Sequence, residues 1–109
     1  MAKPRAWMEG VNHERDVEAK EVEFRKLLVD AFEYIRQNQN DCPWMVKNPQ
    51  LEAKIFTLLE NPHIVKSLAE QWHFQNIYSL TQSVLEKVGC QSEGVISELY
   101  LIFARVQKK

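Results

Sequence analysis

The sequence has little glycine, little cysteine and no excess of charge of either sign. Three glycines among 109 residues leave no glycine-rich loop to cradle a phosphate group. Fourteen basic side chains stand against 15 acidic ones, which excludes a free-standing nucleic-acid binder with a strongly basic surface. The two cysteines, Cys42 and Cys90, lie in no Cys-x-x-Cys pattern. We expect two reduced thiols rather than a zinc site, and a single disulfide is the alternative.

A long apolar run is also missing. The longest unbroken apolar stretch, residues 99–104, is far shorter than the roughly 20 residues that a transmembrane helix needs. No apolar segment follows the first residues of the chain, so no secretory signal peptide is indicated. We therefore expect a soluble, cytoplasmic protein with no membrane partner.

Helical periodicity is what the sequence does contain. From about residue 16 to residue 38, apolar residues recur at spacings of three, four and seven, which predicts one long amphipathic helix. Its apolar stripe consists of Val17, Phe24, Leu27, Leu28, Ala31, Phe32 and Ile35. Residues 1–12 contain Pro4 and Gly10 and show no period. We predict a flexible N-terminal arm there and a single helical-bundle domain over residues 13–109.

Four further helices are predicted downstream, at residues 48–60, 61–73, 75–88 and 93–107. The first two begin with Asn-Pro, a pair suited to the N-cap and first position of a helix. Gly89 is suited to end the third helix, and Ser92 to cap the fourth. No segment alternates polar and apolar residues with a period of two. The predicted fold class is therefore all-α: a compact bundle of about five helices, with a long first helix, two short Asn-Pro-initiated helices and an apolar, central last helix.

The stretch 48–68 resembles the Asn-Pro helical repeats of modules found in co-chaperones and ubiquitin shuttle proteins. The residues that match are Asn48, Pro49, Leu51, Leu58, Leu59, Asn61, Pro62, Ile64 and Leu68. In that family such helices line an apolar groove that holds a client helix, so the resemblance implies a client-binding helical module. The abundant Met and Gln residues that are typical of those modules are missing from this stretch.

Motifs that would carry catalysis or bind a cofactor are absent. The sequence has no Gly-x-Gly-x-x-Gly, no Walker-type loop and no nucleophile elbow. Glu60 and His63 match the Glu-x-x-His spacing of di-iron ligands in helical bundles. Glu70 and His73 match it as well. The first pair spans the predicted helix break at Pro62, and the other glutamates fall on polar arcs. We therefore predict no enzyme, no catalytic residue, no cofactor and no metal site.

Several large apolar residues lie outside the predicted apolar stripes. Val22 and Val29 fall among charged residues of the first helix, and Leu101 lies on the polar arc of the last helix. Trp44 and Met45 lie in a predicted loop that either plugs the end of the bundle or docks a partner. These five residues are the predicted contacts with a protein partner, either a second copy or another chain. The alternative is that loops or the N-terminal arm cover the off-stripe residues.

The predicted function is that of a non-enzymatic, small helical subunit or adaptor that acts through protein contacts in a larger assembly. An alternative is a small helical subunit of a ribonucleoprotein, of the RNA-guided effector type, that contacts the nucleic-acid backbone within the complex. The basic residues predicted for this contact are Arg25, Lys26, Arg36, Lys47, Lys54, Lys66, Lys87, Arg105 and Lys108. A client-binding, co-chaperone-like helical module is the third hypothesis.

Overall fold

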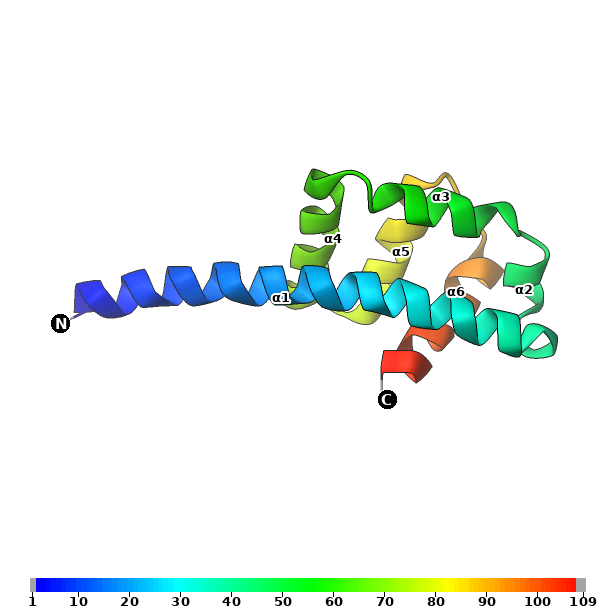
Figure 1. Cartoon of the computed structure of the whole chain (residues 1–109), viewed down its shortest axis with the longest axis horizontal. Coiled ribbons are helices and arrows are strands. Elements are labelled where there is room, and N and C mark those ends of the chain that lie inside the picture. Colours follow the sequence, from blue (N-terminus) through cyan, green and yellow to red (C-terminus); the bar gives the residue numbers. More distant parts are fainter. Residues whose placement is uncertain (1, 108–109) are drawn as a thin grey trace.

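Every regular element in the described part of the chain is a helix, as predicted (Figure 1). The computed structural model describes the backbone of residues 2–107 and the side chains of residues 16–107. The elements in chain order are α1 (Ala2–Gln37), the 3-10 helix η1 (Gln39–Asp41), α2 (Pro43–Val46), α3 (Gln50–Leu58), α4 (Pro62–Phe74), α5 (Ile77–Lys87) and α6 (Glu93–Gln107). The described residues thus form six α-helices rather than about five, because the segment predicted as a loop forms the short helix α2.

The first helix begins earlier than the sequence pattern indicated. α1 starts at Ala2, so the predicted start near residue 16 is wrong, and the backbone of residues 2–12 is helical. Pro4 is compatible with this start because it lies in the first turn, where a backbone N–H has no intrahelical partner. Gly10 lowers helix stability by about 1 kcal/mol relative to alanine, which is too little to stop a helix that is already nucleated. Residue 1 lies outside the described residues, and the flexibility of the arm stays a prediction.

α1 extends beyond the bundle that it helps to build. Its 36 residues span about 54 Å at about 1.5 Å per residue, which is most of the longest dimension of the molecule, 57 Å. Among the side chains that the structure describes, Val17 is the first one on α1 to be buried. Figure 1 shows the preceding turns projecting past α4, with no other helix of the chain beside them.

Four helices form the core of the bundle. α1 packs against α4 and α6, and α5 packs against the same two helices, which closes a ring around one apolar centre. Side chains with no exposed surface in this centre include Phe24, Leu28, Leu68, Leu80, Leu85, Leu99 and Phe103. α3 adds Leu51, Ile55 and Leu58 to the core. Its partly buried Phe56 packs against the core, with its ring 5.4 Å from that of Phe32, measured between centroids. α6 contacts α1, α2 and α5, which agrees with the central place predicted for the last helix.

The two Asn-Pro segments begin their helices in different ways. Asn61 caps α4 as predicted, because its side-chain oxygen accepts hydrogen bonds from the backbone N–H groups of His63 (3.0 Å) and Ile64 (3.4 Å). Asn48 does not cap α3. Its side-chain amide instead donates a hydrogen bond to the Trp44 carbonyl, 2.8 Å away. The two Asn-Pro segments are therefore similar in sequence but not in structure. In the first segment, Asn48 stabilises the turn after α2.

The last two helices lie close to their predicted bounds. Asn76 caps α5 by accepting a hydrogen bond from the Ser79 N–H at 2.8 Å, a cap that the sequence analysis did not include. Ser92 caps α6 as predicted, accepting from the Val95 N–H at 3.4 Å. Gly89 has a φ of 77°, in the left-handed region that glycine enters without a steric penalty. The predicted stop after α5 is thus confirmed.

Removing the cap of α4 tests how the second Asn-Pro segment acts. Asn61→Ala leaves the N–H groups of His63 and Ile64 without this acceptor, and we expect the free energy of unfolding to fall by about 1 kcal/mol. Asn40→Ala is the matched control, because Asn40 is exposed and caps no helix. Urea denaturation followed by circular dichroism measures both variants. Equal losses of stability in the two variants would contradict the cap.

Candidate protein-binding groove beside the last helix

An open groove runs along α6, where α2 and the end of α1 pack against that helix. Its volume is about 790 Å³. The residues that α6 contributes recur every three or four positions, as one helix face does: Gly94, Ser97, Glu98, Leu101, Ile102, Ala104 and Arg105. The opposite wall consists of Tyr34 from α1, Asp41 from η1 and Trp44 from α2. The groove therefore has a mixed lining, in which Leu101, Ile102 and Ala104 lie beside two aromatic and three charged side chains.

Glu98 holds α2 against α6. Its two carboxylate oxygens accept hydrogen bonds from the backbone N–H groups of Trp44 (3.2 Å) and Met45 (2.6 Å). The residue before α2, Cys42, provides no side-chain cap, so a carboxylate from a distant part of the chain supplies the acceptor. A charged acceptor makes such hydrogen bonds roughly twice as strong as neutral ones. Glu98 falls on the polar arc predicted for the last helix, and this role could not be predicted from the sequence, because no local motif connects the two segments.

Trp44 lies flat against the first turn of α6. A Cβ atom at Gly94 would overlap the Trp44 indole, so glycine is needed here for space rather than for its backbone freedom. Trp44 stays 45% exposed, and the Lys47 ammonium lies 5.6 Å from its ring centroid, within the range of a cation–π contact. This arrangement positions one large aromatic side chain before any partner arrives.

Met45, the next residue of α2, points to a different side of the same helical turn. Its side chain is buried in the core, so its prediction as a contact with a partner is wrong. Successive residues of a helix point about 100° apart, and for that reason Met45 plugs the end of the bundle while Trp44 forms part of the groove. The two roles that the sequence analysis left open for this segment are thus divided between neighbouring residues.

Leu101 is the most exposed apolar side chain in the groove, with an exposed fraction of 63%. About one turn further along α6, Arg105 donates a hydrogen bond to the Tyr34 hydroxyl at 2.8 Å, and its guanidinium carbon lies 5.8 Å from the centroid of that ring. This contact ties the end of α6 to α1. Leu101 and Trp44, two of the predicted partner contacts, therefore line the same groove although they are far apart in the sequence.

Val22 and Val29 belong to a second exposed surface. Their exposed fractions are 70% and 52%, and they lie on α1 away from the buried Phe24 and Leu28. Neither valine lines the groove beside α6. Because α1 is one continuous helix from Ala2, the residues before Val22 do not fold back over it as an arm. The predicted partner contacts that are exposed thus fall on two separate surfaces, and their role in binding stays a prediction.

The basic residues predicted for nucleic-acid contact are distributed over five helices and the turn after α2. Some of them are engaged within the fold. Arg36 pairs with Glu52 across α1 and α3, and Arg105 is held by Tyr34. Lys108 lies outside the described residues. Two of the predicted cations are therefore held by partners within the fold.

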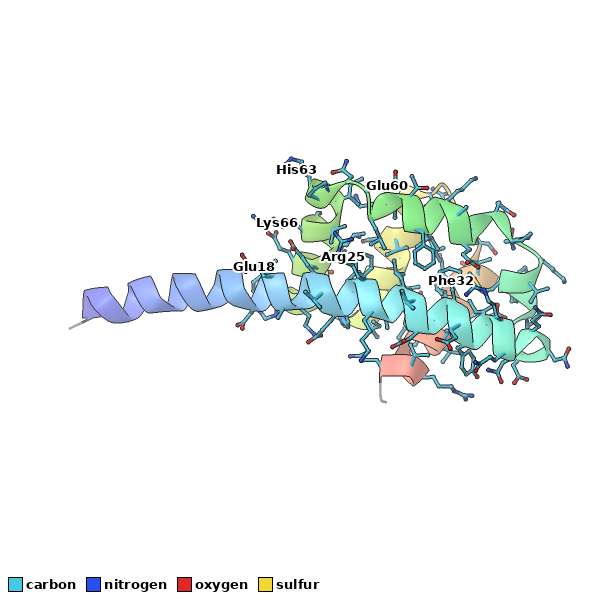
Figure 2. All side chains as sticks on the ribbon, in the orientation of Figure 1. Glu18, Arg25, Phe32, Glu60, His63 and Lys66 are labelled. Atoms are coloured by element: carbon cyan, nitrogen blue, oxygen red, sulfur yellow. The ribbon has the colours of Figure 1, made fainter. Side chains whose placement is uncertain are left out.

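Acidic side chains accompany the basic ones on the face that α1 and α4 share. Figure 2 shows Arg25 and Lys66 on this face together with Glu18, and Glu60 at the turn between α3 and α4. Arg25 also reaches towards the junction of α3 and α4, where its guanidinium donates a long hydrogen bond of 3.5 Å to the Leu59 carbonyl. Because phosphate binding depends on clustered cations, this mixture of charges weakens the case for a phosphate-binding face.

The described residues include neither a group of three metal ligands nor a helix that could span a membrane. Among them, no three His, Cys, Asp or Glu side chains come close enough together to hold a metal ion. No helix in the described part of the chain combines the length and the apolar character needed to cross a membrane. Glu70 and His73 form the Glu-x-x-His pair whose two residues lie on one helix, α4. No third His, Cys, Asp or Glu among the described residues completes a metal site with them.

The two cysteines are free thiols in different surroundings. Cys42 is buried, whereas Cys90 is partly exposed. Burial raises the pKa of the Cys42 thiol, and the carboxylates of Glu98 and Asp41 act in the same direction. Arg105 opposes them by lowering this pKa. Cys42 is therefore held as a neutral thiol rather than prepared as a nucleophile.

Replacing Gly94 by alanine should change the free energy of unfolding in opposite directions with and without the Trp44 indole beside it. In the native chain, Gly94→Ala displaces Trp44 and lowers the free energy of unfolding by about 1–3 kcal/mol. In a Trp44→Ala background the obstruction is gone, and the same change raises stability by up to about 1 kcal/mol because alanine favours the helix. A double-mutant cycle by urea denaturation measures the coupling. Additive effects would mean that Trp44 does not lie on Gly94.

The Cys42 thiol should react slowly. At about pH 8, iodoacetamide should modify Cys42 more slowly than Cys90, because a raised pKa leaves less thiolate and burial limits access. The proton is held more tightly in the folded state, so this group favours unfolding as the pH rises above the pKa of the unfolded thiol. Peptide mass spectrometry follows both sites, and the chain in urea, where both thiols are accessible, is the control. Equal rates in the folded chain would contradict the burial of Cys42.

Comparison with known proteins adds no family to this description. No protein-family model matches the chain, and neither a curated protein nor a solved structure matches it. Any statement about function therefore depends on the groove beside α6 and on the exposed face of α1.

Proposed function

We propose that the protein is a non-enzymatic helical subunit or adaptor that binds another protein through the groove beside α6. The observation that carries this proposal is the joint exposure of Leu101 and Trp44 in that groove. A single exposed leucine is ordinary on a protein surface. A leucine and a tryptophan that line one groove instead offer a partner two large apolar contacts of the kind found at the centre of protein interfaces.

The size of the two side chains supports this proposal. Fully burying a side chain such as that of Leu101 contributes about 1.5–3 kcal/mol. Tryptophan is among the residue types that most often dominate the binding free energy at protein interfaces. A partner that covers Leu101 and the exposed side of Trp44 would thus bury two strong anchors at once.

The groove is also organised before a partner binds. Glu98 fixes the backbone of α2, and Gly94 gives Trp44 a flat surface to lie on. Binding then costs little side-chain ordering at Trp44, which leaves more of the contact energy for affinity. A groove whose tryptophan is fixed by two separate elements of the fold is suited to hold one partner in one position.

The charges in the groove favour a protein over a nucleic acid. Asp41 and Glu98 place two carboxylates there, and they repel phosphate groups. Among the described residues, Arg105 is the cation that lines the groove, and it donates to the Tyr34 hydroxyl. No observation in the described residues specifically favours the ribonucleoprotein alternative or the client-binding module, so we pursue neither as a second proposal.

Leu101 offers a direct test of the groove. A photo-crosslinking amino acid placed at position 101 should form a defined adduct with a partner chain in the native host, and the same amino acid at the exposed Gln82 of α5 should not. Leu101→Glu should weaken recovery of that partner by at least about tenfold, because a charge would replace the buried side chain. Gln82→Glu is the matched control.

Stability is measured on both variants by urea denaturation, since Leu101 is exposed and its replacement should leave folding intact. Equal adduct formation at positions 101 and 82, or full recovery of the partner by folded Leu101→Glu, would contradict the proposed role of the groove.

A further inference from the structure

The exposed face of α1 carries a symmetric arrangement of charge around one valine. Glu18, Val22 and Lys26 are spaced four residues apart, so they lie along one side of the helix, and all three are exposed. Within residues 16–107, neither Glu18 nor Lys26 takes part in an ion pair or a hydrogen bond. The two opposite charges thus lie at equal distances, about 6 Å along the axis, on either side of the exposed Val22.

We propose that this face binds the same face of a second copy of the chain, with the two α1 helices antiparallel and Val22 at the two-fold axis. A rotation about that axis places Glu18 of one copy opposite Lys26 of the other, and it does so twice. The surface is therefore complementary to itself, as a two-fold interface between identical subunits requires. This inference concerns a surface separate from the groove beside α6 and goes beyond the proposed function.

The charges disfavour two other arrangements that would cover the valines. In a parallel pair in register, Glu18 faces Glu18 and Lys26 faces Lys26. In an antiparallel pair that matches Val22 with Val29, Glu18 faces Glu33, and Arg25 faces Lys26. Like charges in opposition weaken both arrangements. The antiparallel pair centred on Val22 joins opposite charges at both flanking positions. A pair centred on Val29 also does so, with Arg25 opposite Glu33, but it leaves the turns before residue 16 without a partner helix, because α1 ends at Gln37.

The length of α1 suits this arrangement. With Val22 at the axis, the turns before residue 16 in one copy lie over Val29 of the other copy. These are the turns that project past the bundle in Figure 1. The pairing thus covers both exposed valines and gives the projecting half of each helix a neighbour. Burial of the valines supplies affinity, whereas the Glu18–Lys26 pairs select the direction and register of the helices.

Charge reversal in the full-length chain tests the proposal. Sedimentation equilibrium at low ionic strength should show a dimer for the native chain. Glu18→Lys and Lys26→Glu should each weaken the dimer by at least about tenfold, because each places like charges opposite each other twice. The double variant, Glu18→Lys with Lys26→Glu, should restore it, since the opposite charges meet again with their positions exchanged. Leu101→Glu is the matched control and should leave the dimer unchanged.

Engineered cysteines test the direction of the helices. Under mild oxidation, Val22→Cys should form a disulfide-linked dimer, because position 22 meets itself at the axis. Val29→Cys should not, since position 29 of one copy lies far from position 29 of the other. The native chain, with its buried Cys42 and partly exposed Cys90, controls for linkage through the natural thiols.

Several outcomes would overturn this inference. A native chain that stays monomeric at submillimolar concentration has no such interface. Efficient linkage through Val29→Cys would overturn the proposed register: linkage at both positions would indicate parallel helices, and linkage at position 29 alone a pair centred on Val29. A double variant as weak as the single ones would exclude the Glu18–Lys26 pairs. Loss of the dimer in Leu101→Glu would place the contact between copies in the groove. None of the first three results would affect adduct formation at position 101, so the two proposals fail separately.

Discussion

The buried face of α1 is the constraint on which the rest of the structure depends. α4 and α6 pack against this face, and α5 packs against both of them, so α1 positions the other core helices directly or through these two. Phe24 and Leu28, which have no exposed surface, lie at its centre. A straight helix that presents one side to a core leaves the opposite side in water. The exposure of Val22 and Val29 is therefore a direct result of the packing that stabilises the bundle.

The groove beside α6 depends on the same packing of α6 against α1, and also on the attachment of α2 to α6. The chain leaves α1, turns through η1 and returns over α6 as α2, a helix of four residues that is too short to hold its own place. Glu98 supplies the missing attachment by accepting two of its backbone N–H groups. Gly94 then lets the Trp44 indole approach the helix backbone. Glu98 and Gly94 thus hold α2, a short surface segment, in place as one wall of the groove.

Local signals made much of the fold predictable. Ser92, Asn61 and Gly89 act at the helix ends as their residue types indicate, because a cap depends on only a few neighbouring residues. Asn48 failed as a cap since its side chain is taken by the turn before it, a contact that the Asn-Pro pair alone does not reveal. The start of α1 was placed too late because its first turns lack the apolar period on which the prediction was based.

The candidate groove was predictable only in part. Leu101 and Trp44 stood out in the sequence as large apolar residues in polar surroundings, and both are exposed. Glu98, Gly94 and Tyr34 did not stand out, because their roles arise from contacts between segments that only the tertiary fold brings together. Helical periodicity can separate an inner from an outer face, but it carries no information about which outer residue meets which neighbour.

The projecting half of α1 also changes how the molecule moves through solution. The radius of gyration is 15.6 Å, against about 13 Å for a compact domain of this length. The excess comes from the helix that extends past the bundle, and an elongated particle experiences more friction than a sphere of the same mass. Gel filtration calibrated with globular standards will therefore overstate the mass of a single chain. An early elution volume is not evidence of a dimer for this protein, and only a method independent of shape can count its copies.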